Sequence, residues 1–191
     1  MERTAGLVLA AGAGRRYGMP KALVRHPDRL LVQLAADTLA EAGCDRTLVV
    51  LGAAADEVRA AAPDLPATVV NPDWATGMGS SLRTGLAALA GTDAQAAVVL
   101  LVDMPGVTAA AVRRVLAHAG PQALAMGGYR ERRGHPVLLG RDHWDGVAAG
   151  ATGDRGARDY LRAHAGQVRV VDVADVADDR DIDVPEQGPH A

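Results

Sequence analysis

The sequence has little of what marks several common classes of protein. It contains no phenylalanine, and aromatic residues make up only 3% of its 191 residues. Its single cysteine, Cys44, excludes a disulfide within the chain and is typical of a reducing compartment. No apolar run approaches the ~20 residues that span a bilayer, and the N-terminus has no signal-peptide pattern. We therefore expect a cytoplasmic protein with an aliphatic core and no membrane partner.

A strong excess of charge is also lacking. The formal net charge of −3 provides no basic field for nucleic acid, so no nucleic-acid partner is expected. Among 20 basic residues the only lysine is Lys21, which follows a glycine-rich stretch. Lysine and arginine differ as phosphate ligands, so this placement suggests a phosphate site, although an arginine-biased composition alone could leave one lysine there. Without a repeat or a composition break, we expect one domain over 1–185 and a frayed tail over 186–191.

Short apolar strands alternate along the chain with segments of helical spacing. Strands are expected at 4–10, 46–51, 67–70, 96–102, 123–126 and 168–171, and another after a charged turn at 130–133. Helices are expected at 30–42, 54–62, 108–118 and 157–164, and one opened by Ser80 or Ser81 and running to Leu89. This alternation predicts an α/β fold with three αβα layers around a mostly parallel, Rossmann-like sheet. Ligands of such sheets bind at the carboxyl ends of the strands.

Two of these carboxyl ends carry residues suited to phosphate chemistry. The first strand leads into a turn with glycines at 12, 14 and 18, two arginines and then Lys21. Glycine lets backbone N–H groups approach phosphate oxygens closely, and the basic side chains add charge of the right sign. The most apolar strand ends at Asp103. The pattern predicts a nucleoside triphosphate site between the two strand ends.

Other nucleotide-binding patterns fit less well. A dinucleotide-binding oxidoreductase needs G-x-G-x-x-G and an acid after the second strand, whereas these glycines follow G-x-G-x-x-x-G and Leu51 is followed by Gly52-Ala53-Ala54. A P-loop needs Gly-Lys-Ser/Thr, which Met19-Pro20-Lys21-Ala22 does not supply. A non-catalytic nucleotide-binding module remains an alternative, but it would have little reason to retain both Lys21 and Asp103.

Several stretches, in the same order as in that family, resemble the MobA-like NTP transferases, most of all the molybdenum cofactor cytidylyltransferase (MocA) branch. Residues 9–21 read L-A-A-G-A-G-R-R-Y-G-M-P-K, similar to the family's opening motif. Residues 71–82 are similar to its N-x-x-W-x-x-G-M-x-x-S-L segment, and 101–105 to its central D-x-P motif. Residues 133–138 and 153–158 are similar to its distal segments. The resemblance covers nearly the whole chain.

The resemblance implies a GT-A-like, Mg²⁺-dependent nucleotidyltransferase that moves CMP from CTP to the phosphate of a molybdopterin-type cofactor and releases pyrophosphate. It implies that Gly12, Gly14 and Arg15 hold the β- and γ-phosphates. Lys21 would reach the α-phosphate, so that Lys21, Arg15 and Asp103 form the catalytic set, in which electrostatic stabilisation dominates. A GTP-using relative or another phosphorylated acceptor stays open within the class.

The resemblance also implies a metal site and a partner. Asp103 would ligate Mg²⁺, a hard cation that takes one or two carboxylates together with phosphate oxygens. A second ligand would come from Asp183 or Asp181, although both could belong to a solvated acidic tail. The implied recipient of the product is a molybdoenzyme or its chaperone.

Base and acceptor contacts follow from the same motifs. The nucleotide would also contact Leu9, Ala10, Ala11, Gly77, Gly79, Ser80 and Ser81. The Ala10-Ala11 pair favours cytidine over guanosine, because the guanylyl branch usually has L-A-G-G there, and Ser81 could instead be a helix cap. The acceptor would contact Met104, Pro105, His135 and Arg133. For the arginines around 130–133, a solvated turn is the alternative to an anion-binding rim.

Overall fold

The computed structural model describes residues 3–182, and all of its main strands form one sheet. The strands are β1 Thr4–Ala10, β4 Arg46–Leu51, β5 Ala67–Val70, β6 Ala96–Leu101, β7 Leu124–Tyr129, β8 Arg132–Gly140 and β9 Arg169–Asp172. Their order is β5-β4-β1-β6-β8-β7-β9. Only β8 runs antiparallel to its neighbours within this sheet. A separate hairpin pairs β2 Arg25–His26 with β3 Arg29–Leu30.

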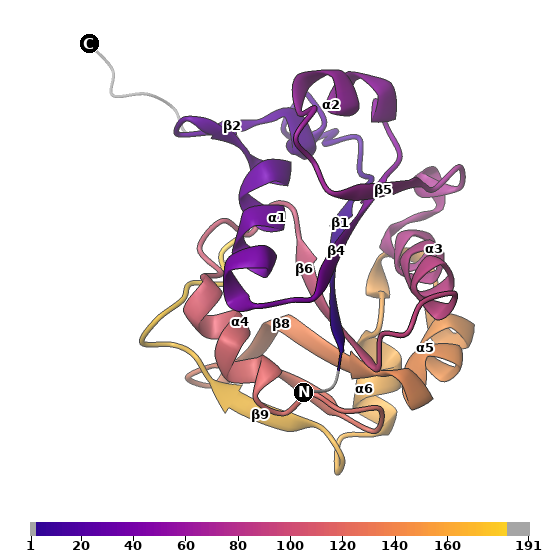
Figure 1. Ribbon diagram of the computed structural model, residues 1–191, viewed down its shortest axis with the longest axis vertical. Coiled ribbons are helices and arrows are strands. Elements are labelled where there is room, and N and C mark those ends of the chain that lie inside the picture. The colour runs from indigo at the N-terminus through magenta and orange to yellow at the C-terminus, as the bar shows by residue number, and fades with distance from the viewer. Residues whose placement is uncertain (1–2, 183–191) are drawn as a thin grey trace.

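Helices cover both faces of the sheet, as Figure 1 shows. The α-helices are α1 Leu31–Ala42, α2 Ala55–Ala61, α3 Met78–Ala90, α4 Ala109–Leu116, α5 Trp144–Gly150 and α6 Arg158–Ala163. Short 3₁₀ helices occur at η1 Lys21–Leu23, η2 Trp74–Thr76, η3 Arg141–His143 and η4 Gly153–Arg155. Helices α1 and α4 pack on one face, and α3, α5 and α6 pack on the other (Figure 1). The expected three-layer α/β fold is confirmed.

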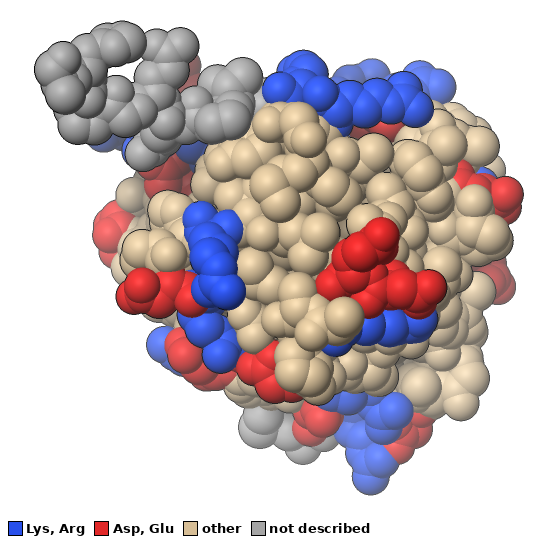
Figure 2. Space-filling view, turned by 90° about the horizontal axis from the view of Figure 1, so that it is seen from above, with Lys and Arg blue, Asp and Glu red and all other residues tan. Residues whose placement is uncertain are grey.

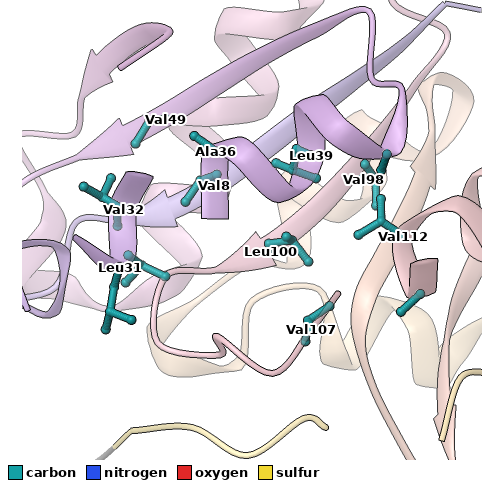
Figure 3. Close-up of a cluster of buried hydrophobic side chains, with 14 of the residues drawn as sticks. Val8, Leu31, Val32, Ala36, Leu39, Val49, Val98, Leu100, Val107 and Val112 are labelled. Carbon is teal, nitrogen blue, oxygen red and sulfur yellow. The ribbon is translucent and has the colours of Figure 1, made fainter. Parts of the chain in front are cut away.

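Two aliphatic cores hold these layers together. Alternate residues of β1 point to opposite faces, so Val8 packs beneath α1 while Leu7 and Leu9 pack beneath α3. Figure 3 shows the first core, in which Leu39 and Val32 of α1 meet sheet side chains and α4. Both faces of the central strands are covered, which explains why those strands read as continuous apolar runs.

Several predicted boundaries agree with the structure, and the disagreements have physical causes. The strands predicted at 4–10, 46–51 and 67–70 are found at those bounds. The expected serine cap of α3 is wrong, because α3 begins at Met78 after Gly77, two to three residues earlier, without a side-chain cap. Helix α5 was not predicted, since its seven residues include two glycines. In the part of the chain that the structure describes, no helix is long and apolar enough to span a membrane.

Candidate active site

The glycine loop after β1 folds back on itself at Gly14. Gly14 has φ +60°, and a Cβ there would lie 1.8 Å from the backbone oxygen of Met19. The N–H of Gly18 donates a hydrogen bond to the Gly14 carbonyl at 2.8 Å and closes the turn. At Gly12, by contrast, a Cβ would meet nothing within 4 Å. Gly14 therefore shapes the loop, and the backbone around Gly12 is left open to a ligand.

This turn brings Lys21 back to the carboxyl end of β6. Its ammonium Nζ donates to Oδ2 of Asp103 at 2.7 Å, and the two side chains are only 15% and 20% exposed. Pro20 precedes the short helix η1 that carries Lys21. The N–H of Val102 donates to the Leu9 carbonyl at 3.2 Å, which extends the β1–β6 pairing up to Asp103. The two strand ends singled out in the sequence are therefore joined by an ion pair.

A first cavity of about 490 Å³ opens beside this pair, a size suited to a small-molecule ligand. Of the residues predicted to bind nucleotide, nine line it: Leu9, Ala11, Gly12, Gly14, Arg15, Lys21, Gly77, Ser81 and Asp103. Ala10 packs instead in the core under α1, on the opposite face of the sheet. Gly79 and Ser80 do not line the cavity either.

The two adjacent serines of α3 have different environments. Both are buried, and the side-chain amide of Asn71 donates to Ser80 Oγ at 2.8 Å and to Ser81 Oγ at 3.0 Å. Ser80 Oγ also contacts the carbonyls of Asp73 and Gly77, so its hydrogen bonds stay within the protein. Ser81 reaches the cavity wall. Asn71 thus orients the serine that faces the cavity.

The glycines at the start of α3 are explained by close packing against the loop around η4. A Cβ at Gly77 would lie 2.5 Å from the backbone of Gly153, and one at Gly79 would lie 2.7 Å from the backbone of Ala151. The carboxylate Oδ1 of Asp154 accepts from the N–H of Met78 at 3.3 Å, where it satisfies a donor at the helix N-terminus. Helix α3 and the η4 loop therefore form one wall.

A second cavity of about 530 Å³ lies on the other side of that wall. It shares Leu9, Met78, Leu101 and Asp154 with the first cavity. The predicted acceptor residues Met104, Arg133 and His135 line it, whereas Pro105 does not. The site thus has two adjoining compartments, each near Asp103.

Figure 2 views the molecule from above Figure 1 and shows small separate groups of basic and acidic side chains among other residues.

His135 is the most perturbed titratable group at this end of the sheet. Burial lowers the pKa of His135 to about 4, although the negative charges of Asp103 and Asp179 oppose the shift. The phenol of Tyr129 donates to the His135 carbonyl at 2.5 Å, which fixes the backbone there. The imidazole is therefore neutral at neutral pH and has one ring nitrogen able to accept a hydrogen bond.

The metal-ligand predictions divide between described and undescribed residues. Asp103 lines the first cavity and Asp181 lines the second. Asp183 lies outside the described residues. Within residues 3–182, no group of three or more His, Cys, Asp or Glu side chains gathers as a metal site. One carboxylate facing a triphosphate-sized cavity fits Mg²⁺, which takes its remaining ligands from phosphate oxygens and water.

Sequence reasoning missed Trp74 and the reason for Gly52. A Cβ at Gly52 would lie 2.5 Å from Cβ of Trp74 and 2.8 Å from Cβ of Ala11. Trp74 lines the first cavity and fills the space beside the end of β4, where a dinucleotide fold places its ribose-binding acid. The missing acid could be seen in the sequence, but the tryptophan that takes its space comes from a segment 22 residues later.

Cys44, predicted to be a small structural residue, lies between α1 and β4 against the first core. Burial, and then the charge of Asp45, raises the pKa of its thiol to about 12. The thiol is therefore protonated and unreactive at neutral pH.

Comparisons with known proteins agree with this architecture. The family model described as "MobA-like NTP transferase domain" matches residues 6–168. A curated relative, nicotine blue oxidoreductase from Paenarthrobacter nicotinovorans, is 39% identical over 95% of this chain and 93% of its own length. The crystal structure of Rv0371c from Mycobacterium tuberculosis has a TM-score of 0.78 at 31% identity and covers 90% of this chain and 88% of its own.

Two further structures extend the comparison. Rv0371c has also been crystallised as a complex with manganese, with a TM-score of 0.73 at 32% identity over 90% of this chain and 88% of that one. A nucleotidyl transferase from Methanothermobacter has a TM-score of 0.78 at 21% identity, covers 91% of this chain and 88% of its own, and supports the fold alone. The chain belongs to the MobA-like NTP transferase family. The description of this family as NTP transferases gives the enzyme class, nucleotidyltransferase.

Proposed function

We propose that the protein transfers CMP from CTP to the phosphate of a molybdopterin-type cofactor and releases pyrophosphate. The observation that carries the proposal is the Lys21–Asp103 ion pair of 2.7 Å, in the wall of a nucleotide-sized cavity that adjoins a second cavity. Two adjoining compartments suit a reaction between two bound substrates, and reactants held together gain most of their rate from positioning.

In this reaction an oxygen of the acceptor phosphate attacks the α-phosphorus of CTP. The bond from the α-phosphorus to the bridging oxygen breaks, and that oxygen leaves with pyrophosphate. Negative charge grows on the α-phosphate and on the leaving group, so cations already fixed in place stabilise the transition state. Lys21 supplies such a charge at the α-phosphate, and the backbone around Gly12 with Arg15 binds the leaving phosphates.

Asp103 would hold the Mg²⁺ ion. Mg²⁺ neutralises phosphate charge when bound, and the manganese complex of the relative Rv0371c supports a divalent ion in this family. Lys21 holds the Asp103 carboxylate in place beside the cavity. Asp183, which lies outside the described residues, would be the second metal ligand, with Asp181 as the alternate.

Ser81 and Trp74 would read the base. Ser81 offers a hydroxyl at the cavity wall, and Trp74 offers an aromatic surface for stacking. The Ala10-Ala11 pair favours CTP over GTP by resemblance, although Ala10 packs away from the cavity. We expect the product to pass to a molybdoenzyme or its chaperone in the cytoplasm.

A nucleotide-preference assay tests the proposal. Purified protein with Mg²⁺, molybdenum cofactor and each NTP in turn should release pyrophosphate fastest with CTP. The same mixtures with Asp103→Asn protein control for contaminating activity. Release of pyrophosphate with GTP alone would mean that GTP, and not CTP, is the nucleotide substrate. No release with any NTP would contradict the transferase reaction.

The 39% identical relative is named an oxidoreductase, so the dinucleotide-dependent oxidoreductase weighed in the sequence analysis is the second candidate. The packing of Trp74 beside Gly52 disfavours the usual dinucleotide mode, because the space for a ribose-binding acid is filled. Following NADH and NADPH absorbance with a dye-like quinone acceptor tests this candidate directly. Oxidation that depends on the protein but not on Lys21 would favour the oxidoreductase over the transferase.

A further inference from the structure

The second cavity lies between one face of β8 and one stripe of α6. Along β8, Arg133, His135, Val137 and Leu139 alternate, and all of them line the cavity, as the two-residue period of a strand requires. From α6, Arg158, Leu161 and Arg162 line it at the three- and four-residue spacing of one helix face, and Ala165 lines it from the turn that follows the helix. The cavity thus has two regular walls from distant parts of the sequence.

The strand wall changes from charged to apolar along β8, and the helix wall carries Arg158 at its start and Arg162 one turn later. Strand β8 is antiparallel to β6, with Val137 opposite Val99. Continuing this register brings His135 to the level of Leu101, the last residue of β6, and Arg133 beyond it toward Asp103. Helix α6 starts beside the start of α3, because a Cβ at Gly156 would lie 3.6 Å from the sulfur of Met78. The charged mouth therefore lies at the Asp103 end. The floor is aliphatic and includes Leu139, Leu161 and Val168.

Two arginines at this mouth form no ion pair within residues 3–182. Five arginines line the cavity, and three of them pair with acids: Arg132 with Asp179 at 2.8 Å, and Arg155 and Arg162 with Asp159 at 2.9 and 4.0 Å. Neither Arg133 nor Arg158 forms an ion pair with any residue that the structure describes.

The acids lining the cavity do not cancel this charge. The three aspartates are fewer than the five arginines. Asp179 is paired with Arg132, Asp154 accepts from the Met78 N–H, and Asp181 is exposed. The mouth therefore keeps a positive balance next to Arg133 and Arg158.

The geometry points to a specificity device: Arg133 and Arg158 clamp the phosphate of an acceptor whose apolar body fills the cavity below. The inference rests on the proposed function, because it places the attacking phosphate beside Lys21 and Asp103. Two arginine forks bind a phosphate with charge-assisted hydrogen bonds, and aliphatic walls favour a body of low polarity. Sugar phosphates, whose hydroxyl groups find few partners on such a floor, should bind poorly.

Calorimetric titration of the metal-free full chain without nucleotide tests the inference. The probes are 1-naphthyl phosphate and ribose 5-phosphate, which share a phosphate monoester and differ in the body. We expect 1-naphthyl phosphate to bind about 10-fold or more tightly, because burying a ring system removes apolar surface from water. Arg133→Gln and Arg158→Gln should each weaken its binding by about 10-fold. Arg169→Gln, which removes an exposed charge on β9, is the matched control.

Near-UV circular dichroism checks that each variant is folded, and where a glutamine variant is not, the lysine variant at that position replaces it. Lysine keeps the positive charge but lacks the forked guanidinium that makes two hydrogen bonds to a phosphate. The lysine variant should therefore bind 1-naphthyl phosphate about 3-fold more weakly. Equal affinity for the two probes, unchanged affinity in both arginine variants, or displacement of 1-naphthyl phosphate by CTP would each overturn the inference. Absence of CMP transfer with this binding pattern intact would instead overturn the proposed function alone.

Discussion

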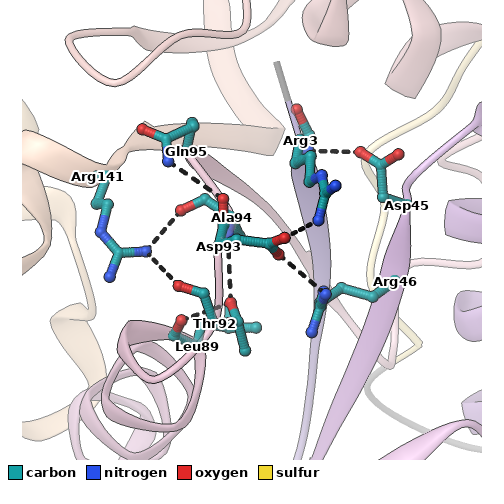
Figure 4. A network of polar contacts seen from close by, with 10 residues as sticks. Arg3, Asp45, Arg46, Leu89, Thr92, Asp93, Ala94, Gln95 and Arg141 are labelled. Atoms are coloured by element: carbon teal, nitrogen blue, oxygen red, sulfur yellow. Dashed lines mark hydrogen bonds and ion pairs between the residues drawn. The ribbon is translucent and has the colours of Figure 1, made fainter. Parts of the chain in front are cut away.

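The two ends of the sheet use charged side chains in opposite ways. At the amino ends of β1, β4 and β6 they form a closed network (Figure 4): Asp93 pairs with Arg3 and with Arg46, the latter at 3.0 Å. Arg141 there donates to the carbonyls of Thr92, Ala94 and Ala90 at 2.9, 2.7 and 2.6 Å. At the carboxyl ends the charges surround two cavities.

This difference separates stability from binding within one fold. The network at the amino ends satisfies the backbone carbonyls where α3 turns into β6, so its charges hold the chain in place. The cavity end keeps open space beside Gly12, and its Arg133 and Arg158 form no ion pair with the residues that the structure describes. Substitutions at the two ends should therefore affect different measurements.

The largest expected effect is on turnover at the cavity end. Lys21→Met removes the ammonium and keeps an unbranched side chain, so kcat should fall by about 10²-fold or more because a transition-state charge is lost. The kcat of Asp103→Asn should fall by a similar factor. The midpoint of urea unfolding should move little, since the ion pair faces a cavity that water can enter. Turnover of Lys21→Met within 3-fold of the natural protein would remove Lys21 from the catalytic set.

The opposite result is expected for Arg141→Gln at the amino ends. This change removes three hydrogen bonds to carbonyls and the stacking of the guanidinium, 5.2 Å above the Trp144 ring. The free energy of unfolding should fall by about 2 kcal/mol, as measured by urea denaturation, while kcat and KM stay unchanged. Arg169→Gln on the exposed face of β9 should cost less than about 0.5 kcal/mol. A drop in kcat without a loss of stability would contradict the separation of the two ends.

How much of this the sequence could predict depends on whether a feature is local. The strand at 46–51 could be predicted because its six residues are mainly apolar and lie between turn signals. The end of α1 could be predicted because Gly43 follows it, and in the structure Gly43 has φ +97°. The start of α3 could not be predicted in this way. Gly77 and Gly79 pack closely against the backbone of residues 151–153, which are more than 70 positions away in the sequence. Local patterns thus fixed most elements, and tertiary packing moved one boundary.

The candidate site divides in the same way. The glycine loop and Asp103 could be placed at one edge of the sheet from sequence alone, because both follow parallel strands whose carboxyl ends meet there. The ion pair between Lys21 and Asp103 was not predicted. Arg158 could not be assigned, because its role depends on α6 packing over β8. The separation of Ser80 from Ser81 also depends on the position of Asn71, which only the folded chain gives.

The two adjacent serines of α3 also differ in that one should affect binding and the other stability. Ser81→Ala should raise KM for CTP by about 10-fold with little loss of stability, because its hydroxyl faces the cavity. Ser80→Ala should lower the free energy of unfolding by about 1 kcal/mol, because its hydroxyl bonds within the protein, and should change KM less. Initial-rate kinetics and urea denaturation of both variants give the two numbers. Equal KM values for the two variants would argue against base recognition by Ser81.

The smallest effect expected is acid sensitivity of stability, and it should come from the cavity end. The pKa of His135 is about 4 in the folded chain and near 6.5 when unfolded, so the unfolded state binds the extra proton between these values. Stability from the neutral imidazole is complete above pH 6.5 and is lost as pH falls toward 4.

The loss should be about 1 kcal/mol, less than the full shift implies, because the ring is partly exposed to solvent. His135→Gln should flatten this part of the stability profile, measured by urea denaturation from pH 4 to 7 without metal. Because the charges of Asp103 and Asp179 also act on the ring, the comparison uses the difference between the two proteins at each pH. An identical slope in His135→Gln would mean that the acid sensitivity comes from carboxylates, and that the cavity holds no histidine forced to stay neutral.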